Sequence, residues 1–149
     1  MEFLGRDDLI DLIIPRGGAT LMKTVTENTT IPVIKHDKGG CHVYVDGHAN
    51  LDMAQKVAFN AKVQRPSTCN AMETLLVHQQ IARTFLTNLG KELVRAKVEI
   101  RGCEKTCSFI PEAVSATDED YGQEFLGLTL AVKVVKDMDH AMEHIQQYG

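Results

Sequence analysis

The sequence predicts an α/β fold in which a mostly parallel sheet is flanked by helices. Short apolar segments bounded by polar, Gly or Pro residues alternate with longer amphipathic segments, a pattern typical of strands joined through helices. A length of 149 residues is enough for one domain with a real core. The composition, 44% hydrophobic and 24% charged, excludes a disordered, collagen-like or coiled-coil chain.

The start of the chain is predicted to form a strand, a helix and a second strand. Residues 9–15 are a short apolar run between polar neighbours, which favours a buried strand. A helix is expected just after Gly18, and residues 31–34 form a second strand with Pro32 at its beginning. Residues 9–35 therefore predict a compact βαβ unit.

The rest of the chain continues the alternation. Strands are expected at residues 41–45, 74–77, 98–100 and 128–135. A helix over residues 51–63 is capped by Asn50 and stopped before Pro66, and a second helix covers residues 81–93. The first of these helices carries an apolar face made of Met53, Ala54, Val57, Ala58 and Ala61.

The last part of the chain gives a weaker pattern. Residues 101–120, which include an acidic run, are predicted to form a loop. A final helix is expected to run from an Asp139 cap towards Gly149. No strand follows this helix, as in a truncated α/β sheet.

Charge and hydropathy exclude several function classes. Sixteen basic and twenty acidic residues give a formal charge of −4 without a basic stripe, which argues against nucleic-acid binding. No apolar run approaches the ~18 residues of a membrane span, and the N-terminus does not resemble a signal peptide. Four cysteines are too few for a disulfide scaffold, so the chain is expected to be cytoplasmic with free thiols.

A glycine turn follows the first predicted strand. Arg16, Gly17 and Gly18 precede a helix, where free backbone N–H groups and the helix dipole favour a phosphate. A tight strand-to-helix turn explains two glycines equally simply. The turn matches neither a dinucleotide-binding fingerprint nor a P-loop.

Cys69 lies in a polar connection bent by Pro66, with Arg65 nearby in sequence. A neighbouring cation and backbone dipoles favour the nucleophilic thiolate. A small buried side chain is the alternative, because free cysteines are commonly buried. The residues alone leave the two readings open.

No metal site is predicted. Cys103 and Cys107 are separated by three residues and lack a second pair, which does not fit a structural zinc site. His140 and His144 share a helix face, but the glutamate between them is not placed as in a zinc protease. Surface histidines explain this pair more simply.

Several motifs together resemble one family. They are Asp11-Leu-Ile-Ile-Pro-Arg-Gly-Gly18, Cys41-His-Val-Tyr-Val-Asp46, Gln64-Arg-Pro-Ser-Thr-Cys-Asn70, Glu73-Thr-Leu-Leu-Val77 and Glu124-Phe-Leu. In this order they resemble the gamma-glutamyl phosphate reductase family of the aldehyde dehydrogenase superfamily, over nearly the whole chain. The family's fold is an aldehyde dehydrogenase-like α/β catalytic domain, and the chain resembles a truncated form of it.

The resemblance implies a reaction and its nucleophile. Family members reduce gamma-glutamyl phosphate with NADPH to glutamate gamma-semialdehyde, the second step of proline synthesis. The family's nucleophile falls on Cys69, whose thiolate would displace phosphate and form a thioester. The backbone N–H of Cys69 would stabilise the oxyanion. No metal is required at this site.

The resemblance also implies cofactor and substrate residues. Glu124, with Phe125, corresponds to the glutamate that binds the nicotinamide ribose, and the Arg16–Gly18 turn to the cofactor-side turn. Arg65 and Asn70 lie close enough in sequence to Cys69 to orient the substrate.

The resemblance further implies an organisation and partners. Residues 1–36 would close a dinucleotide-binding domain, and residues 37–149 would form an incomplete catalytic domain. Homo-oligomerisation and association with the glutamate kinase of the same pathway are further implications. Two alternatives stay open: a folded but inactive fragment, and a thiol-bearing module that does not bind a cofactor by itself.

Overall fold

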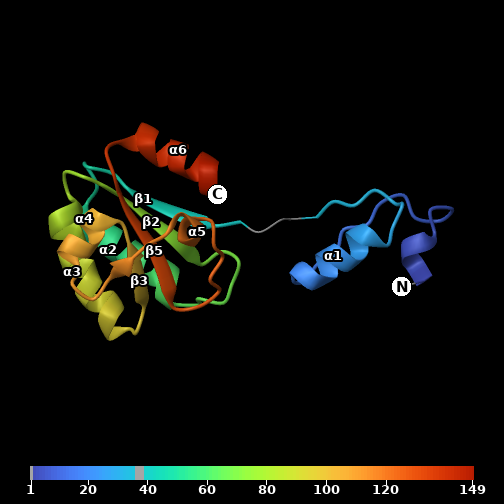
Figure 1. The fold of residues 1–149 in the computed structure, drawn as a ribbon, viewed down its shortest axis with the longest axis horizontal. Helices are drawn as coiled ribbons and strands as arrows, with labels where there is room; N and C mark the ends of the chain where they lie inside the picture. The colour runs from blue at the N-terminus through green and yellow to red at the C-terminus, as the bar shows by residue number, and fades with distance from the viewer. Residues whose placement is uncertain (1, 36–38) are drawn as a thin grey trace. The chain divides into compact units, whose positions relative to one another are not determined.

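The computed structural model describes residues 2–35 and 39–149. The chain divides into two compact units, 1–38 and 39–149, and each is described by itself. The predicted boundary between residues 36 and 37 lies outside the described residues, so the functional division drawn there stays a prediction. Figure 1 shows the elements of both units.

The small unit contains the expected helix but little strand. A 3₁₀ helix, η1 (Glu2–Gly5), precedes α1 (Ala19–Glu27). The strands predicted at 9–15 and 31–34 are reduced to one parallel bridge between Ile13 and Val33. That prediction is wrong in extent because two strands without a third neighbour seldom sustain a ladder.

The large unit is built on a five-stranded, fully parallel sheet. Its strands are β1 (Cys41–Val45), β2 (Met72–His78), β3 (Glu99–Gly102), β4 (Val114–Ser115) and β5 (Thr129–Val135). Their order in the sheet is β1-β2-β5-β3-β4. The predicted α/β class with a parallel sheet is confirmed.

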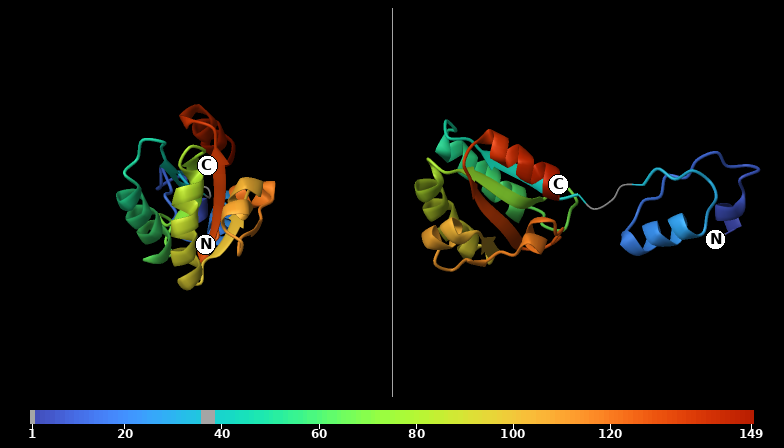
Figure 2. Two further views of the ribbon diagram at one scale, coloured as in Figure 1. Left: turned by 90° about the vertical axis from the view of Figure 1, so that its left-hand side faces the viewer. Right: turned by 45° about the horizontal axis from the view of Figure 1, so that its top comes forward.

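Helices cover both faces of this sheet (Figures 1 and 2). They are α2 (Leu51–Val63), α3 (Ala82–Arg95), α4 (Glu104–Phe109), α5 (Asp118–Tyr121) and α6 (Met138–Tyr148). Leu75 of β2 packs with α2 and α3 in the main core, whereas Leu76 packs with Ala141 of α6 on the opposite face. Successive strand residues point to opposite faces, so both layers bury apolar area.

The start of α2 is confirmed, but its predicted apolar face is partly wrong. Asn50 accepts a hydrogen bond from the Met53 backbone N–H, as an N-cap does. Met53 and Val57 are 66% and 51% exposed, while Ala58 and Lys62 are fully buried. The buried stripe is therefore turned about the helix axis and includes a lysine.

The stretch 101–120 is not the loop that the sequence predicts. It holds the end of β3, then α4, β4 and the start of α5. These elements are too short to show a clear period in the sequence. A Cβ atom at Gly102 would lie 2.6 Å from Thr106 Cγ2, so this glycine lets α4 pack directly against β3.

The last helix begins earlier than predicted. Asp137, rather than Asp139, caps α6, because its carboxylate accepts the His140 backbone N–H at 2.9 Å. Gly149 occupies the expected C-terminal cap position. Among the described residues, no helix has both the length and the hydropathy needed to cross a bilayer.

Candidate active site

The predicted nucleophile and part of the predicted cofactor site lie at the same edge of the sheet. Cys69 lies just before β2, and Glu124 and Phe125 lie just before β5. Because β2 and β5 are parallel neighbours, their amino-terminal ends meet. The fold thus brings together two segments that are far apart in the sequence.

A tight turn presents Cys69 to solvent. The Thr68 hydroxyl donates to the Arg65 carbonyl at 2.8 Å, and the Ala71 N–H donates to the Thr68 carbonyl at 2.9 Å. Cys69 is exposed, which contradicts the reading of a small buried side chain. Arg65 and Asn70 are exposed on either side of it, where they are accessible to a substrate.

A second thiol, which the sequence analysis did not assign to the site, contacts this turn. The Cys41 S–H donates to the Cys69 carbonyl at 3.2 Å. Burial raises the pKa of Cys41, and the nearby charges of Cys69, Glu73 and Glu124 raise it further. Cys41 therefore resists ionisation and lies close to the other groups of this edge.

A buried ion pair lies beneath the Cys69 turn. Lys62 Nζ donates to a Glu73 carboxylate oxygen at 2.7 Å, and the two side chains are 0% and 2% exposed. The other carboxylate oxygen accepts the Leu126 backbone N–H at 3.1 Å. Glu73 thus joins α2, β2 and the segment that carries Glu124 and Phe125.

Phe125 is flanked by two cations. Lys62 Nζ and the Arg101 guanidinium lie 5.9 and 5.5 Å from the centre of its ring, within cation–π range. Arg101 is itself anchored by Asp120, at 2.5 Å, and by Glu99, at 2.9 Å.

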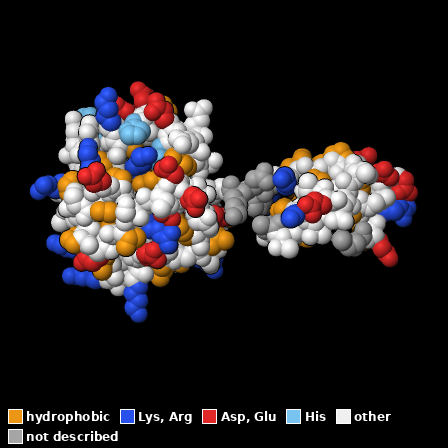
Figure 3. All heavy atoms as spheres, viewed as in Figure 1, with side chains coloured by type: hydrophobic (Ala, Val, Ile, Leu, Met, Phe, Trp, Pro, Cys, Tyr) orange, Lys and Arg blue, Asp and Glu red, His pale blue; other side chains and the backbone are white. Residues whose placement is uncertain are grey.

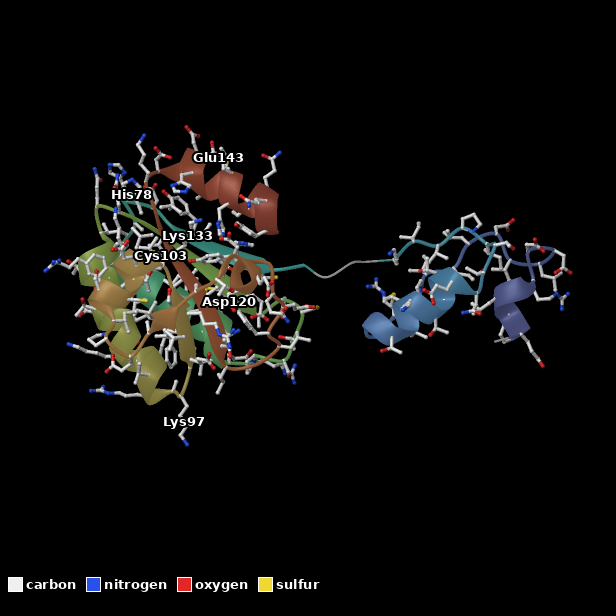
Figure 4. The ribbon with its side chains drawn as sticks, in the orientation of Figure 1. His78, Lys97, Cys103, Asp120, Lys133 and Glu143 are labelled. Atoms are coloured by element: carbon white, nitrogen blue, oxygen red, sulfur yellow. The ribbon has the colours of Figure 1, made fainter. Side chains whose placement is uncertain are left out.

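Asp120, labelled in Figure 4, anchors Arg101 as a carboxylate. Burial opposes its ionisation, but the Thr117 N–H and the Arg101 guanidinium hold the pKa of this carboxyl below its usual value. The same carboxylate completes the capping box of α5. The segment that carries Glu124 and Phe125 therefore follows a helix, α5, whose start is fixed by Asp120.

The Glu124 carboxylate is available for a ligand. It is half-buried, and within residues 2–35 and 39–149 no hydrogen bond or ion pair engages it. A carboxylate of this kind can accept two hydroxyl hydrogens. The hydroxyls of a nicotinamide ribose are donors that fit this acceptor.

The other residues that the sequence predicts for the cofactor, Arg16, Gly17 and Gly18, belong to the unit 1–38, which is described by itself. Gly18 begins α1 without a side-chain cap, which leaves backbone N–H groups open. Gly17 has a φ of +156°, and a Cβ atom there would lie 2.7 Å from Leu21 Cδ2. With the exposed Arg16 beside it, the turn has the chemistry of a phosphate site.

Metal-ligating side chains do not gather in the described part of the chain. No group of three or more His, Cys, Asp or Glu residues there could hold an ion. His144, interpreted from the sequence as a surface residue, is 2% exposed and packs between Tyr121 and Tyr148. That interpretation is wrong because α6 lays this side chain against the sheet.

Comparison with known proteins identifies the segment. No protein-family model matches the chain. It is 59% identical over 140 residues to the gamma-glutamyl phosphate reductase of Carboxydothermus hydrogenoformans, covering 94% of this chain and 34% of that protein. The chain spans about a third of the length of the curated relatives it matches.

Two solved structures are similar to this chain. The crystal structure of gamma-glutamyl phosphate reductase from Thermotoga maritima matches with a TM-score of 0.93 and 47% identity, over 99% of this chain and 36% of that one. An NADP-dependent glyceraldehyde-3-phosphate dehydrogenase from Bacillus halodurans, complexed with NADP, matches with a TM-score of 0.68 and 18% identity, over 93% and 37% of the chains. The second match shows the fold alone. The chain is therefore homologous to about one third of a gamma-glutamyl phosphate reductase and has an aldehyde dehydrogenase-like α/β fold.

Proposed function

We propose that this chain carries the catalytic cysteine of an NADPH-dependent gamma-glutamyl phosphate reductase. The observation that carries the proposal is the exposed Cys69 at one sheet edge with Glu124 and Phe125, in a chain homologous to that enzyme. Residues 1–36 would form the closing part of the dinucleotide-binding domain. Homo-oligomerisation and association with glutamate kinase belong to the same proposal and rest on the resemblance alone, whereas the cytoplasmic location rests on the cysteine content of the sequence.

The first half-reaction uses Cys69 as nucleophile. Its thiolate attacks the acyl carbon of gamma-glutamyl phosphate, the C–O bond to phosphate breaks, and a thioester forms. The exposed position of Cys69 admits the substrate. Its backbone N–H is the local donor for the oxyanion, and Arg65 and Asn70 orient the phosphate and carboxylate groups.

The second half-reaction reduces the thioester. NADPH, when bound, would supply the hydride for this reduction to the aldehyde, and Cys69 would leave as the thiolate. Glu124 accepts the ribose hydroxyls, and Phe125 fixes the position of that segment between Lys62 and Arg101. The Arg16–Gly18 turn binds a cofactor phosphate through Arg16 and the open end of α1.

A chimera tests the proposal directly. The chimera is the full-length Thermotoga maritima enzyme with its matched segment replaced by this chain, assayed in reverse with glutamate gamma-semialdehyde, phosphate and NADP⁺. We expect NADPH formation, a loss of at least about 1,000-fold in Cys69→Ser, and an unchanged rate in Cys103→Ser. A folded but inactive chimera, or normal turnover by Cys69→Ser, would contradict the proposed function.

The isolated chain tests the two alternatives. As a folded but inactive fragment, it would bind NADPH weakly, because the phosphate contacts of a dinucleotide come from several loops. Cys69 would still be acylated by acetyl phosphate, detected as a hydroxylamine-sensitive thioester by peptide mass spectrometry. A binding module without reductase chemistry would give no thioester.

A further inference from the structure

The Lys62–Glu73 ion pair closes the connection that carries Cys69. Lys62 lies in the last turn of α2 and Glu73 near the start of β2, so the 2.7 Å contact joins the two ends of the Cys69 segment. Both charges are withdrawn from water. The base of the nucleophile turn is thus fixed from within the core.

Glu73 also holds the segment on the cofactor side. Its second oxygen accepts the Leu126 N–H at 3.1 Å. Leu126 has a φ of +50°, a left-handed conformation that is unfavourable for a residue with a Cβ atom. The hydrogen bond from the Leu126 N–H to Glu73 therefore stabilises a backbone conformation that Leu126 would not favour by itself.

Stability alone does not explain the pair. Replacing a buried ion pair by apolar residues of similar volume is often neutral or stabilising, because desolvation offsets much of the Coulomb attraction. What an apolar pair cannot supply is an acceptor for the Leu126 N–H together with a cation 5.9 Å from the Phe125 ring. Both of these contacts reach the segment that carries Glu124.

We propose that Lys62 and Glu73 are positioning residues that hold the Glu124–Phe125 segment at a fixed place relative to Cys69, and so set the affinity for the nicotinamide cofactor. Both side chains are buried and are therefore not accessible to a substrate. The inference rests on the proposed function of Cys69 and Glu124. It extends that function from the reacting groups to the core beneath them.

Three variants in the chimera separate positioning from stability. Glu73→Gln keeps an acceptor for Leu126 but removes the charge. Glu73→Leu also removes the acceptor, and both single variants leave Lys62 without its counter-ion. Lys62→Met combined with Glu73→Leu removes both charges, so no unpaired charge stays buried and the protein should fold with near-original stability.

The two steady-state constants, KM for NADP⁺ and kcat, should respond differently. The double variant should show a KM for NADP⁺ raised at least about tenfold, with kcat reduced less than threefold and an ordinary melting temperature. Glu73→Gln should keep the KM within about threefold. A double variant with an unchanged KM would overturn the inference, because the pair would then serve stability only.

Thr106→Val is the matched control. Thr106 is fully buried and donates to the Val132 carbonyl at 3.2 Å, so this variant also loses a buried hydrogen bond. It lies where β3 ends, away from Cys69 and Leu126. We expect it to lower stability without changing the KM for NADP⁺; a raised KM would show that any loss of core stability has this effect and would overturn the inference.

Amide hydrogen exchange tests the positioning without catalysis. In the 149-residue chain, the Leu126 N–H should be protected, stay protected in Glu73→Gln and lose protection in the double variant. Equal protection of this N–H in the unmodified chain, in Glu73→Gln and in the double variant would overturn the inference even if the chimera is active. If instead the starting chimera folds but is inactive, the proposed function fails by itself, and the inference about cofactor affinity fails with it.

Discussion

The Cys41 thiol donates to the backbone oxygen of Cys69 at 3.2 Å, so the protein contains an exposed cysteine directly supported by a half-buried one. The two thiols differ in solvent access and in electrostatic surroundings. Burial and the charges of Cys69, Glu73 and Glu124 keep Cys41 in its neutral form, which is the form that donates this hydrogen bond.

Alkylation should therefore distinguish the two cysteines. Since the pKa of Cys41 is raised, its thiolate appears only at a pH above the usual range for cysteine, near 8.5, and iodoacetamide should label Cys69 first at every lower pH. Peptide mass spectrometry of the folded chain would give both rates. Cys41→Ser keeps a donor and should preserve the rate at Cys69; faster labelling of Cys41 would contradict this account.

Asp120 should contribute to stability as a carboxylate. Asp120→Asn weakens the contact to Arg101 and the acceptor for Thr117, and should lower the free energy of unfolding by about 1–3 kcal/mol. Because the folded pKa lies below the usual value, this contribution is present above about pH 4 and is lost as the pH falls through the folded pKa. Urea unfolding at pH 7 and pH 3 would measure it.

Asp118→Asn is the control for that measurement. Asp118 is exposed, lies in the first turn of the same helix, and accepts a long 3.4 Å contact from the Tyr148 hydroxyl. Its loss should change stability by less than about 0.5 kcal/mol. Equal effects of the two variants would mean that the acidic turn acts through net charge rather than through Asp120.

Most of the large unit could be predicted from local sequence signals. The strand at 41–45 and the helix at 51–63 have the predicted bounds, since two glycines precede the strand, and the Asn50 cap and a downstream proline mark the ends of the helix. Residues 101–120 could not be predicted, because α4 and α5 depend on tertiary contacts of Gly102 and Asp120. Propensity over so few residues carries little information.

The groups beneath the site were predictable only in part. A glutamate inside the buried strand β2 requires a partner, so Glu73 signals one. The sequence does not identify Lys62 as this partner, because the predicted apolar face of α2 includes Met53 and Val57 and would place Lys62 on the solvent side of the helix. The contact of Glu73 with the Leu126 N–H depends on the strand order, which the sequence does not encode locally.

The glycine turn of the small unit should separate folding from phosphate binding. Gly17→Ala forces a Cβ to within 2.7 Å of Leu21 Cδ2 at an unfavourable φ, and should destabilise the unit by about 1 kcal/mol. Gly18→Ala meets no atom within 4 Å and should leave folding unchanged.

The same pair of variants addresses the cofactor. If a phosphate approaches this turn, Gly18→Ala should raise the KM for NADP⁺ in the chimera although the unit folds normally. Amide exchange of α1 would report the folding, and initial rates would report the KM. An unaltered KM in Gly18→Ala would leave the tight-turn reading as the explanation of these glycines.

Docking of α6 should depend on pH through His144. Lys133, labelled in Figure 4, comes from β5. It donates to His144 Nδ1 at 3.3 Å, and His42 and His140 are the other nearby titratable histidines. Burial, and then the charge of Lys133, lower the pKa of His144 to about 4. Figure 3 shows acidic and basic side chains interspersed on the visible face of this unit. This face therefore has no large patch of one charge sign that would add to the pH dependence of stability.

The direction of the effect follows from the lowered pKa. The folded state favours neutral His144, so its contribution is complete above the unfolded pKa near 6.5 and falls by about 3 kcal/mol as the pH drops to 4. His144→Phe keeps the ring packing against Tyr121 and Tyr148 but cannot be protonated, so its stability should lose most of this slope. Urea midpoints at several pH values would measure the slope, with His48→Gln as an exposed control. A slope that persists in His144→Phe would assign the pH dependence to other groups.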